Sequence, residues 1–169
     1  AWAFSPITLG DWTGLLDSPL LIGDNSIMGL SGFILAGVSA NMGVLVFFMF
    51  QMVFMDTAAT IPTGSMAERL KFSGFVLMGL WVSMFIYPIV SSWVWGGGWL
   101  ANLGRTMNLG NGAVDFAGSG VVHMIGGSLA LAGAIVIGPR IGRFNKDGTP
   151  NSMPGHNIPM GILGTIILF

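Results

Sequence analysis

The sequence predicts an all-α fold, a polytopic bundle of transmembrane helices. Only 8% of the residues are charged, whereas soluble domains average about a quarter. Hydrophobic residues make up 53% of the chain, and the mean hydropathy is +0.78. The apolar residues form continuous runs, several of them long enough to cross a bilayer. These observations indicate an integral membrane protein, and the 27 glycines suit helices that pack closely in lipid.

The composition also argues against several classes of protein. Without cysteine there is no disulfide, thiolate metal site or thiol catalysis. The sequence contains no nucleophile–base pair, zinc motif, phosphate-binding loop or basic tract for nucleic acid. We therefore expect neither an enzyme nor a bound cofactor. The chain starts without an initiator methionine and stops inside an apolar run, so we expect an internal piece of a longer protein.

The first segment, residues 1–38, reads as a polar loop rich in turns. The apolar stretch 29–40 at its end is too short to span a membrane. It predicts a short helix that dips in from the surface, or the approach to the next span.

The first complete transmembrane helix is expected at 41–66. Phe50 and Phe54 are four residues apart and share one of its faces. Asp56 is a carboxylate within the span, either functional or tied to Thr57, Thr60 or donors on another helix. Pro62 predicts a kink near the inner end of the helix.

A second transmembrane helix is expected at 72–94. An aromatic belt marks its far end, as is common at a membrane interface: Tyr87, Trp93, Trp95 and Trp99. The three glycines at 96–98 then preclude a regular helix.

The third transmembrane helix, 118–138, contains a single ionisable residue, His123. Its twenty-one residues would extend about 31 Å, enough to cross the hydrocarbon core. Small residues lie near His123 on one side, and Gly126, Ala130, Ala134 and Gly138 repeat at steps of four. An imidazole at this depth either faces a narrow path through the membrane or is satisfied between packed helices. Asp115 precedes the helix and suits its positive N-terminal end.

Residues 158–169 begin a further transmembrane helix. Five of the six basic residues fall in the loops 67–71 and 139–157, which lie two spans apart and so face the same side. The positive-inside rule makes that side the cytoplasm, and it places 1–38 and 95–117 outside. His156 falls in a cytoplasmic loop, too far from His123 for the two to share a metal ion.

Phe50, Phe54 and Trp95 are candidates for an outer cation site. Aromatic rings attract a cation through their quadrupoles, at about 0.5–2 kcal/mol each. The alternative is that these rings only pack or face lipid. His123 is the second candidate, because a neutral imidazole can relay a proton or hold a small hydrogen-bonding guest.

Four blocks of the sequence, in order, resemble the ammonium transporters of the Amt/Mep/Rh family. They are FQMVFMDTAATIPTGSMAERLKFSGF, YPIVSSWVWGGGWLANLG, VDFAGSGVVHMIGGSLALAGAIVIGPRIG and PGHNIPMGILGT. They cover most of residues 40–169, so the chain is expected to be part of an ammonium transporter domain.

The resemblance implies a homotrimer in which each subunit has its own pore. By position, Trp95 and Phe54 would line the outer ammonium recruitment site, with Phe50 on the same pore helix and Phe54 part of an aromatic gate. His123 would be the first of two pore histidines, and Asp115 would support the recruitment site. A PII-type regulatory protein is a possible partner on the cytoplasmic side.

The function expected from the resemblance is transport of ammonium or ammonia across the cell membrane. The cation would be recruited at the aromatic site and deprotonated, and ammonia would pass a hydrophobic pore lined by histidine. The alternative is an ammonium sensor coupled to a C-terminal signalling module. A structural or electron-carrying membrane subunit would need a second intramembrane histidine opposite His123.

Overall fold

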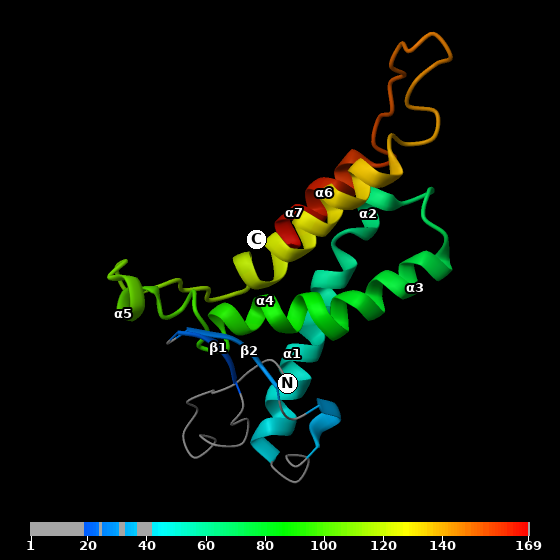
Figure 1. Cartoon of the computed structure of the whole chain (residues 1–169). Helices are drawn as coiled ribbons and strands as arrows, with labels where there is room; N and C mark the ends of the chain where they lie inside the picture. The colour runs from blue at the N-terminus through cyan, green and yellow to red at the C-terminus, as the bar shows by residue number, and fades with distance from the viewer. Residues whose placement is uncertain (1–18, 24, 31–32, 37–41, 169) are drawn as a thin grey trace. The chain divides into compact units, whose positions relative to one another are not determined.

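The computed structural model describes residues 19–23, 25–30, 33–36 and 42–168 (Figure 1). It divides into two units, 1–137 and 138–169, which are described separately. Residues 1–18 of the expected outer loop lie outside the described residues. So does most of the expected short helix at 29–40, of which the structure describes a single 3₁₀ turn, η2 (Phe33–Leu35).

The first described element is an antiparallel hairpin of two short strands, β1 (Pro19–Ile22) and β2 (Asn25–Gly29). The tight turn between them includes Gly23, whose φ of 60° favours glycine. The segment predicted as an irregular loop therefore contains a small sheet. A two-stranded hairpin is marginal by itself, and this one is hydrogen-bonded to the loop between the second and third stretches, described below.

Three apolar helical stretches are long enough to cross a membrane: Met42–Met66, Phe72–Val94 and Ser119–Ile137. The first stretch consists of α1 (Met42–Thr60) and α2 (Thr63–Met66). The second consists of α3 (Phe72–Trp81), the π-helical η3 (Val82–Ile86) and α4 (Tyr87–Val94). The third consists of the π-helical η4 (Ser119–Met124) and α6 (Ile125–Ile137). Only 17–22% of each stretch is buried, so most of its apolar side chains need lipid or further helices around them. The predicted class, a helical membrane protein, is confirmed.

Pro62 separates α1 from α2. Proline has no backbone N–H to continue the helix, and α1 ends at Thr60. The Thr63 hydroxyl donates to the Thr60 carbonyl at 2.6 Å, and the Ser65 hydroxyl donates to the Pro62 carbonyl at 2.8 Å. Side-chain hydroxyls thus satisfy carbonyls that the interrupted helix leaves open.

A π-helical segment, η3, lies in the middle of the second stretch. Pro88 follows it, and because proline cannot donate to the carbonyl four residues earlier, the helix widens just before it. The backbone N–H of Tyr87 bonds the Val82 carbonyl, five residues back. The extra residue in this turn changes the direction in which the following side chains point.

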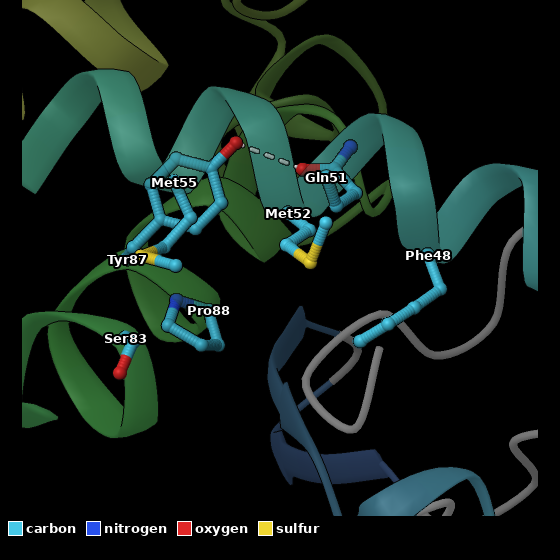
Figure 2. Close-up of a pocket in the computed structure, with 7 residues that line it drawn as sticks. All are labelled: Phe48, Gln51, Met52, Met55, Ser83, Tyr87 and Pro88. Carbon is cyan, nitrogen blue, oxygen red and sulfur yellow. Dashed lines mark hydrogen bonds between the residues drawn. The ribbon is translucent and has the colours of Figure 1, made fainter.

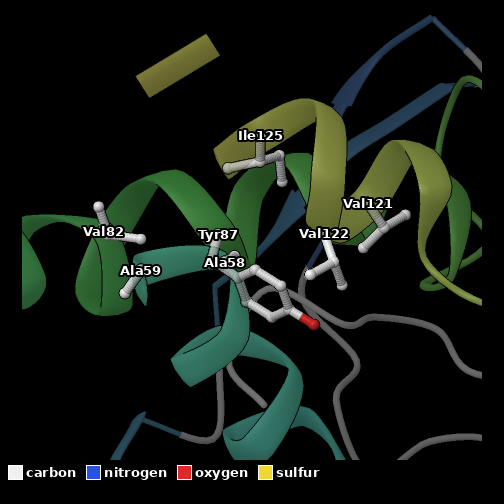
Figure 3. Packing of buried hydrophobic residues seen from close by; sticks show 7 residues of the cluster. All are labelled: Ala58, Ala59, Val82, Tyr87, Val121, Val122 and Ile125. Atoms are coloured by element: carbon white, nitrogen blue, oxygen red, sulfur yellow. The ribbon is translucent and has the colours of Figure 1, made fainter. Parts of the chain in front are cut away.

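The core lies where the three stretches meet, and its side chains come from all of them (Figure 3). The buried cluster comprises Ala58, Ala59, Val82, Tyr87, Val121, Val122 and Ile125. Tyr87 is only 2% exposed, so it belongs to this core and not to the interfacial belt expected from the sequence. It lies seven residues inside the end of its helix, about 10 Å along the axis.

Two glycines allow α6 to approach the first stretch closely. A Cβ on Gly126 would lie 2.6 Å from the Ile61 Cβ, and one on Gly133 would lie 2.5 Å from the Met66 sulfur. The sequence instead indicated four-residue steps from Gly126 to Gly138, but no heavy atom lies within 4 Å of the Cβ position at Gly138. The close contacts are seven residues apart, or about two turns.

The loop between the second and third stretches is tied to the β-hairpin. The Trp93 indole N–H donates to the Ile27 carbonyl at 2.9 Å, and the Trp99 N–H donates to the Ser26 carbonyl at 3.0 Å. A Cβ on Gly98 would lie 2.7–2.9 Å from three backbone atoms, so only glycine fits there. The loop also contains a short helix, α5 (Leu103–Met107).

The second unit consists of a polar loop followed by α7 (Ile158–Leu168). The loop folds back on itself, with the Asn145 N–H bonded to the Thr149 carbonyl and the Asn151 N–H bonded to the Arg143 carbonyl. Hydrogen bonds from the hydroxyl and N–H of Thr149 hold the pKa of the exposed Asp147 below its usual value.

Candidate functional site

Phe50, Phe54 and Trp95 lie against one another where α1 meets the end of α4. The ring centroids of Phe50 and Phe54 are 4.5 Å apart, and those of Phe54 and Trp95 are 5.4 Å apart in a perpendicular arrangement. The ring centroids of Phe50 and Trp95 are 6.1 Å apart. Phe54 and Trp95 also pack against the buried core, whereas Phe50 is 47% exposed. We call these three residues the aromatic cluster.

A single hydrogen bond fixes the indole of Trp95. Its Nε1–H donates to the backbone carbonyl of Asp115 at 2.6 Å, although the two residues are twenty positions apart. This bond joins the end of α4 to the start of the third stretch. The ring face of Trp95 is therefore held in place by the backbone that precedes His123.

The Asp115 carboxylate caps the N-terminus of that stretch. Oδ1 accepts hydrogen bonds from the N–H groups of Gly118 and Ser119 and from the Ser119 hydroxyl. Oδ2 accepts from the N–H groups of Gly120 and Val121, at 2.9 and 2.7 Å. These contacts confirm the cap that the sequence predicts. Partial burial raises the pKa of Asp115, but the hydrogen bonds outweigh burial and leave this pKa below its ordinary value.

Gly118 joins the cap to the aromatic cluster. Its φ of 96° is in the region that disfavours side chains. A Cβ there would lie 2.8 Å from the Val122 Cγ2 and 3.3 Å from the Trp95 ring. The position therefore requires glycine for both its backbone conformation and its space.

His123 lies in the π-helical turn η4 that follows Gly118. Its backbone N–H donates to the Gly118 carbonyl at 2.9 Å, and its imidazole Nδ1 lies 3.3 Å from the same oxygen. Val121 and Val122 are buried in the core, but the His123 side chain is exposed. Within the described chain no ring contact joins His123 to the aromatic cluster.

Gln51 is a polar residue within the first transmembrane stretch, and the sequence does not show which residue it pairs with. The Tyr87 hydroxyl donates to Gln51 Oε1 at 2.9 Å, and both side chains are buried (Figure 2). The pair borders a cavity of about 230 Å³, lined also by Phe48, Met52, Met55, Ser83 and Pro88. A buried amide needs such a partner, but no sequence pattern shows which hydroxyl supplies it.

Asp56 is exposed on α1, and the nearby threonine hydroxyls bond backbone carbonyls instead of its carboxylate. Thr57 donates to Val53 and Thr63 donates to Thr60. Across residues 19–168, wherever the structure describes them, no three His, Asp or Glu side chains are grouped to hold a metal ion.

Fold and site together define a multi-pass helical membrane protein in which aromatic rings from the first spanning stretch pack against Trp95 at the end of the second. The chain matches the model of the Ammonium Transporter Family over residues 19–169, most of its length. It belongs to the ammonium transporter family.

Curated relatives support this assignment. The chain is 48% identical to ammonium transporter Amt2 of Archaeoglobus fulgidus over 145 residues, which is 85% of this chain and 31% of the relative. It is 40% identical to ammonium transporter 1 member 3 of Solanum lycopersicum over 146 residues, covering 86% of this chain and 32% of the relative. It is 44% identical to ammonium transporter 1 member 2 of Arabidopsis thaliana over 126 residues, covering 73% of this chain and 24% of the relative.

The chain thus spans about a third or less of the length of these relatives. No solved structure matches it. The relatives are named as transporters and not as enzymes.

Proposed function

We propose that this chain is part of a protein that carries ammonium or ammonia across the cell membrane. The observation that supports this most is the packing of Phe50, Phe54 and Trp95 in a chain of this family. Since the named relatives are transporters, we propose transport and not sensing.

The aromatic cluster recruits the cation. Each ring face contributes about 0.5–2 kcal/mol of attraction, more when water is excluded. Phe50 packs its ring 4.5 Å from that of Phe54, while Phe54 and Trp95 are anchored in the core. The hydrogen bond from Trp95 to Asp115 keeps the indole from rotating away.

Deprotonation follows recruitment, because a bare charge at the centre of a bilayer costs at least about 2.5 kcal/mol and often far more. Neutral ammonia avoids this cost. In our proposal His123 lies on the path beyond the cluster, where its imidazole holds ammonia or relays the proton. The trimeric assembly and the PII-type partner stay predictions of the family resemblance.

Uptake of labelled methylammonium by the full-length protein tests this function. Trp95→Leu removes one ring from the recruitment site, so the apparent KM is expected to rise about 2- to 30-fold, the equivalent of one cation–π contact. Trp81→Leu is the matched control, because Trp81 is exposed on α3 and contacts Phe85 instead of the cluster.

His123→Ala is expected to lower the maximal uptake rate by roughly a hundredfold, the lower end of what a positioned acid–base group contributes. Membrane levels of each variant normalise the rates. Unchanged KM in Trp95→Leu would refute recruitment at the cluster, and an unchanged rate in His123→Ala would refute a role for the imidazole on the path.

A further inference from the structure

The buried pair Gln51–Tyr87 joins the two helices that carry the aromatic cluster. Gln51 lies on α1 between Phe50 and Phe54, and Tyr87 is the first residue of the helix that ends beside Trp95. Their hydrogen bond of 2.9 Å and the 5.4 Å contact between Phe54 and Trp95 both join the first stretch to the second. Changing the position of one helix relative to the other would alter both.

Packing is incomplete beside this pair. The cavity of about 230 Å³ borders Gln51 and Tyr87 and is lined by side chains of α1, η3 and α4, which are drawn in Figure 2. The side chains beside the pair do not fill this pocket, so apolar packing within the described residues constrains the two helices less there. A hydrogen bond has a preferred length and direction, and in a buried site it supplies the missing constraint.

The backbone directs Tyr87 toward Gln51. Pro88 prevents a regular hydrogen bond, the helix widens through η3, and the Tyr87 N–H reaches the Val82 carbonyl. Tyr87 consequently lies in the core, only 2% exposed, and its ring packs in the cluster of buried residues against which Phe54 and Trp95 also pack. The hydroxyl ends on Gln51, which is 5% exposed.

We propose that Gln51 and Tyr87 are positioning residues for cation recruitment: their hydrogen bond sets the register of α1 against α4, and so the spacing of Phe54 and Trp95. Neither residue touches the cation. The inference depends on the proposed recruitment role of the aromatic cluster.

The test compares Tyr87→Phe, Gln51→Met and the double variant in methylammonium uptake by the full-length protein, with thermal stability measured in parallel. Tyr87→Phe leaves a buried amide without its partner, so both stability and affinity are expected to fall. The apparent KM is expected to rise roughly threefold or more, because displaced rings lose part of the attraction of one cation–π contact. The maximal rate is expected to stay unchanged.

The double variant separates positioning from stability. It removes both polar groups, so no buried amide is left unpaired and stability is expected to recover toward that of the native protein. Because the directional bond is still missing, the KM is expected to stay raised. If the KM recovers together with stability, the pair is only structural and the inference is wrong. If Tyr87→Phe does not reach the membrane, the double variant carries the test.

Ser83→Ala is the matched control. Ser83 lines the same cavity, but its hydroxyl donates within its own helix to the Leu80 carbonyl at 3.0 Å. Its KM is expected to remain native. A raised KM in Trp95→Leu with a native KM in Tyr87→Phe would refute the positioning role alone, whereas native values in both would refute recruitment at the cluster.

Discussion

Asp115 shows how one residue can hold the aromatic cluster in place without belonging to it. Its carboxylate takes hydrogen bonds from four backbone N–H groups at the start of the third stretch, and its carbonyl takes the indole N–H of Trp95. The two functions are coupled, because the cap fixes the backbone to which the carbonyl belongs. Loss of the carboxylate should therefore affect both helix stability and the orientation of the indole.

We expect Asp115→Asn to destabilise the protein by about 1–3 kcal/mol, because one of the two carboxylate oxygens that each accept two backbone N–H groups is lost and its donors are left unpaired. The asparagine amide keeps one acceptor oxygen but turns an NH₂ group toward N–H donors. Thermal unfolding of the purified protein measures this effect. A variant as stable as the native protein would show that water replaces the carboxylate without cost.

The pH dependence of that difference can be predicted from the lowered pKa of Asp115. A carboxyl group with a depressed folded-state pKa stabilises the fold above its unfolded pKa, about 4, and loses that contribution as the pH falls through the lower folded value. The stability difference between native protein and Asp115→Asn should be constant from about pH 5 to 8 and shrink below about pH 4. A difference that varied between pH 5 and 8 would point to another titrating group.

At the scale of elements, two helix interruptions decide which faces meet. Pro62 ends α1, and α2 then packs against α6. Pro88 and the π-helical segment before it direct the Tyr87 side chain toward the core. Both prolines are visible in the sequence. Their consequences depend on which neighbouring helix is present, because a kink redirects a helix without specifying what it will contact.

The contact between α6 and the first stretch should depend on Gly126. We expect Gly126→Ala to destabilise the protein by about 1–3 kcal/mol, because the new methyl group would overlap the side chain of Ile61. Gly127→Ala is the control: no heavy atom lies within 4 Å of its Cβ position, and alanine favours helix by up to about 1 kcal/mol. Thermal unfolding of the two variants side by side checks the pair, and equal stability would mean that Ile61 moves aside freely.

At the scale of the whole molecule, charge predicts the orientation in the membrane. Five of six basic residues belong to the loops 67–71 and 139–157, and Arg105 lies in the outer loop. This chain has no cysteine, so once any cysteine elsewhere in the full-length protein is replaced by serine, a single introduced thiol reports the sidedness of its loop. We expect Met107→Cys to react with a membrane-impermeant maleimide on intact cells, and Lys146→Cys to react only after permeabilisation. The reverse pattern would invert the proposed direction of recruitment.

The sequence indicates several residues of the candidate site, but it does not indicate which of them contact one another. The shared face of Phe50 and Phe54 follows from helical spacing, and the resemblance pointed to Trp95 and Asp115. The bond from the Trp95 indole to a backbone carbonyl could not be foreseen, since every residue has such a carbonyl. Gln51 was visible as a polar residue in a span, but its partner Tyr87 was assigned to the membrane interface.

The sequence by itself determined that this is a helical membrane protein, where its apolar stretches lie, and which family it resembles. Hydropathy and motifs are local properties, so they can be read along the chain. Only the tertiary structure decided that Phe54 meets Trp95, that Tyr87 is buried against Gln51, and that Gly126 and Gly133 admit the neighbouring helix. Those contacts join residues tens of positions apart, and they depend on helix crossings that periodicity within a single helix does not specify.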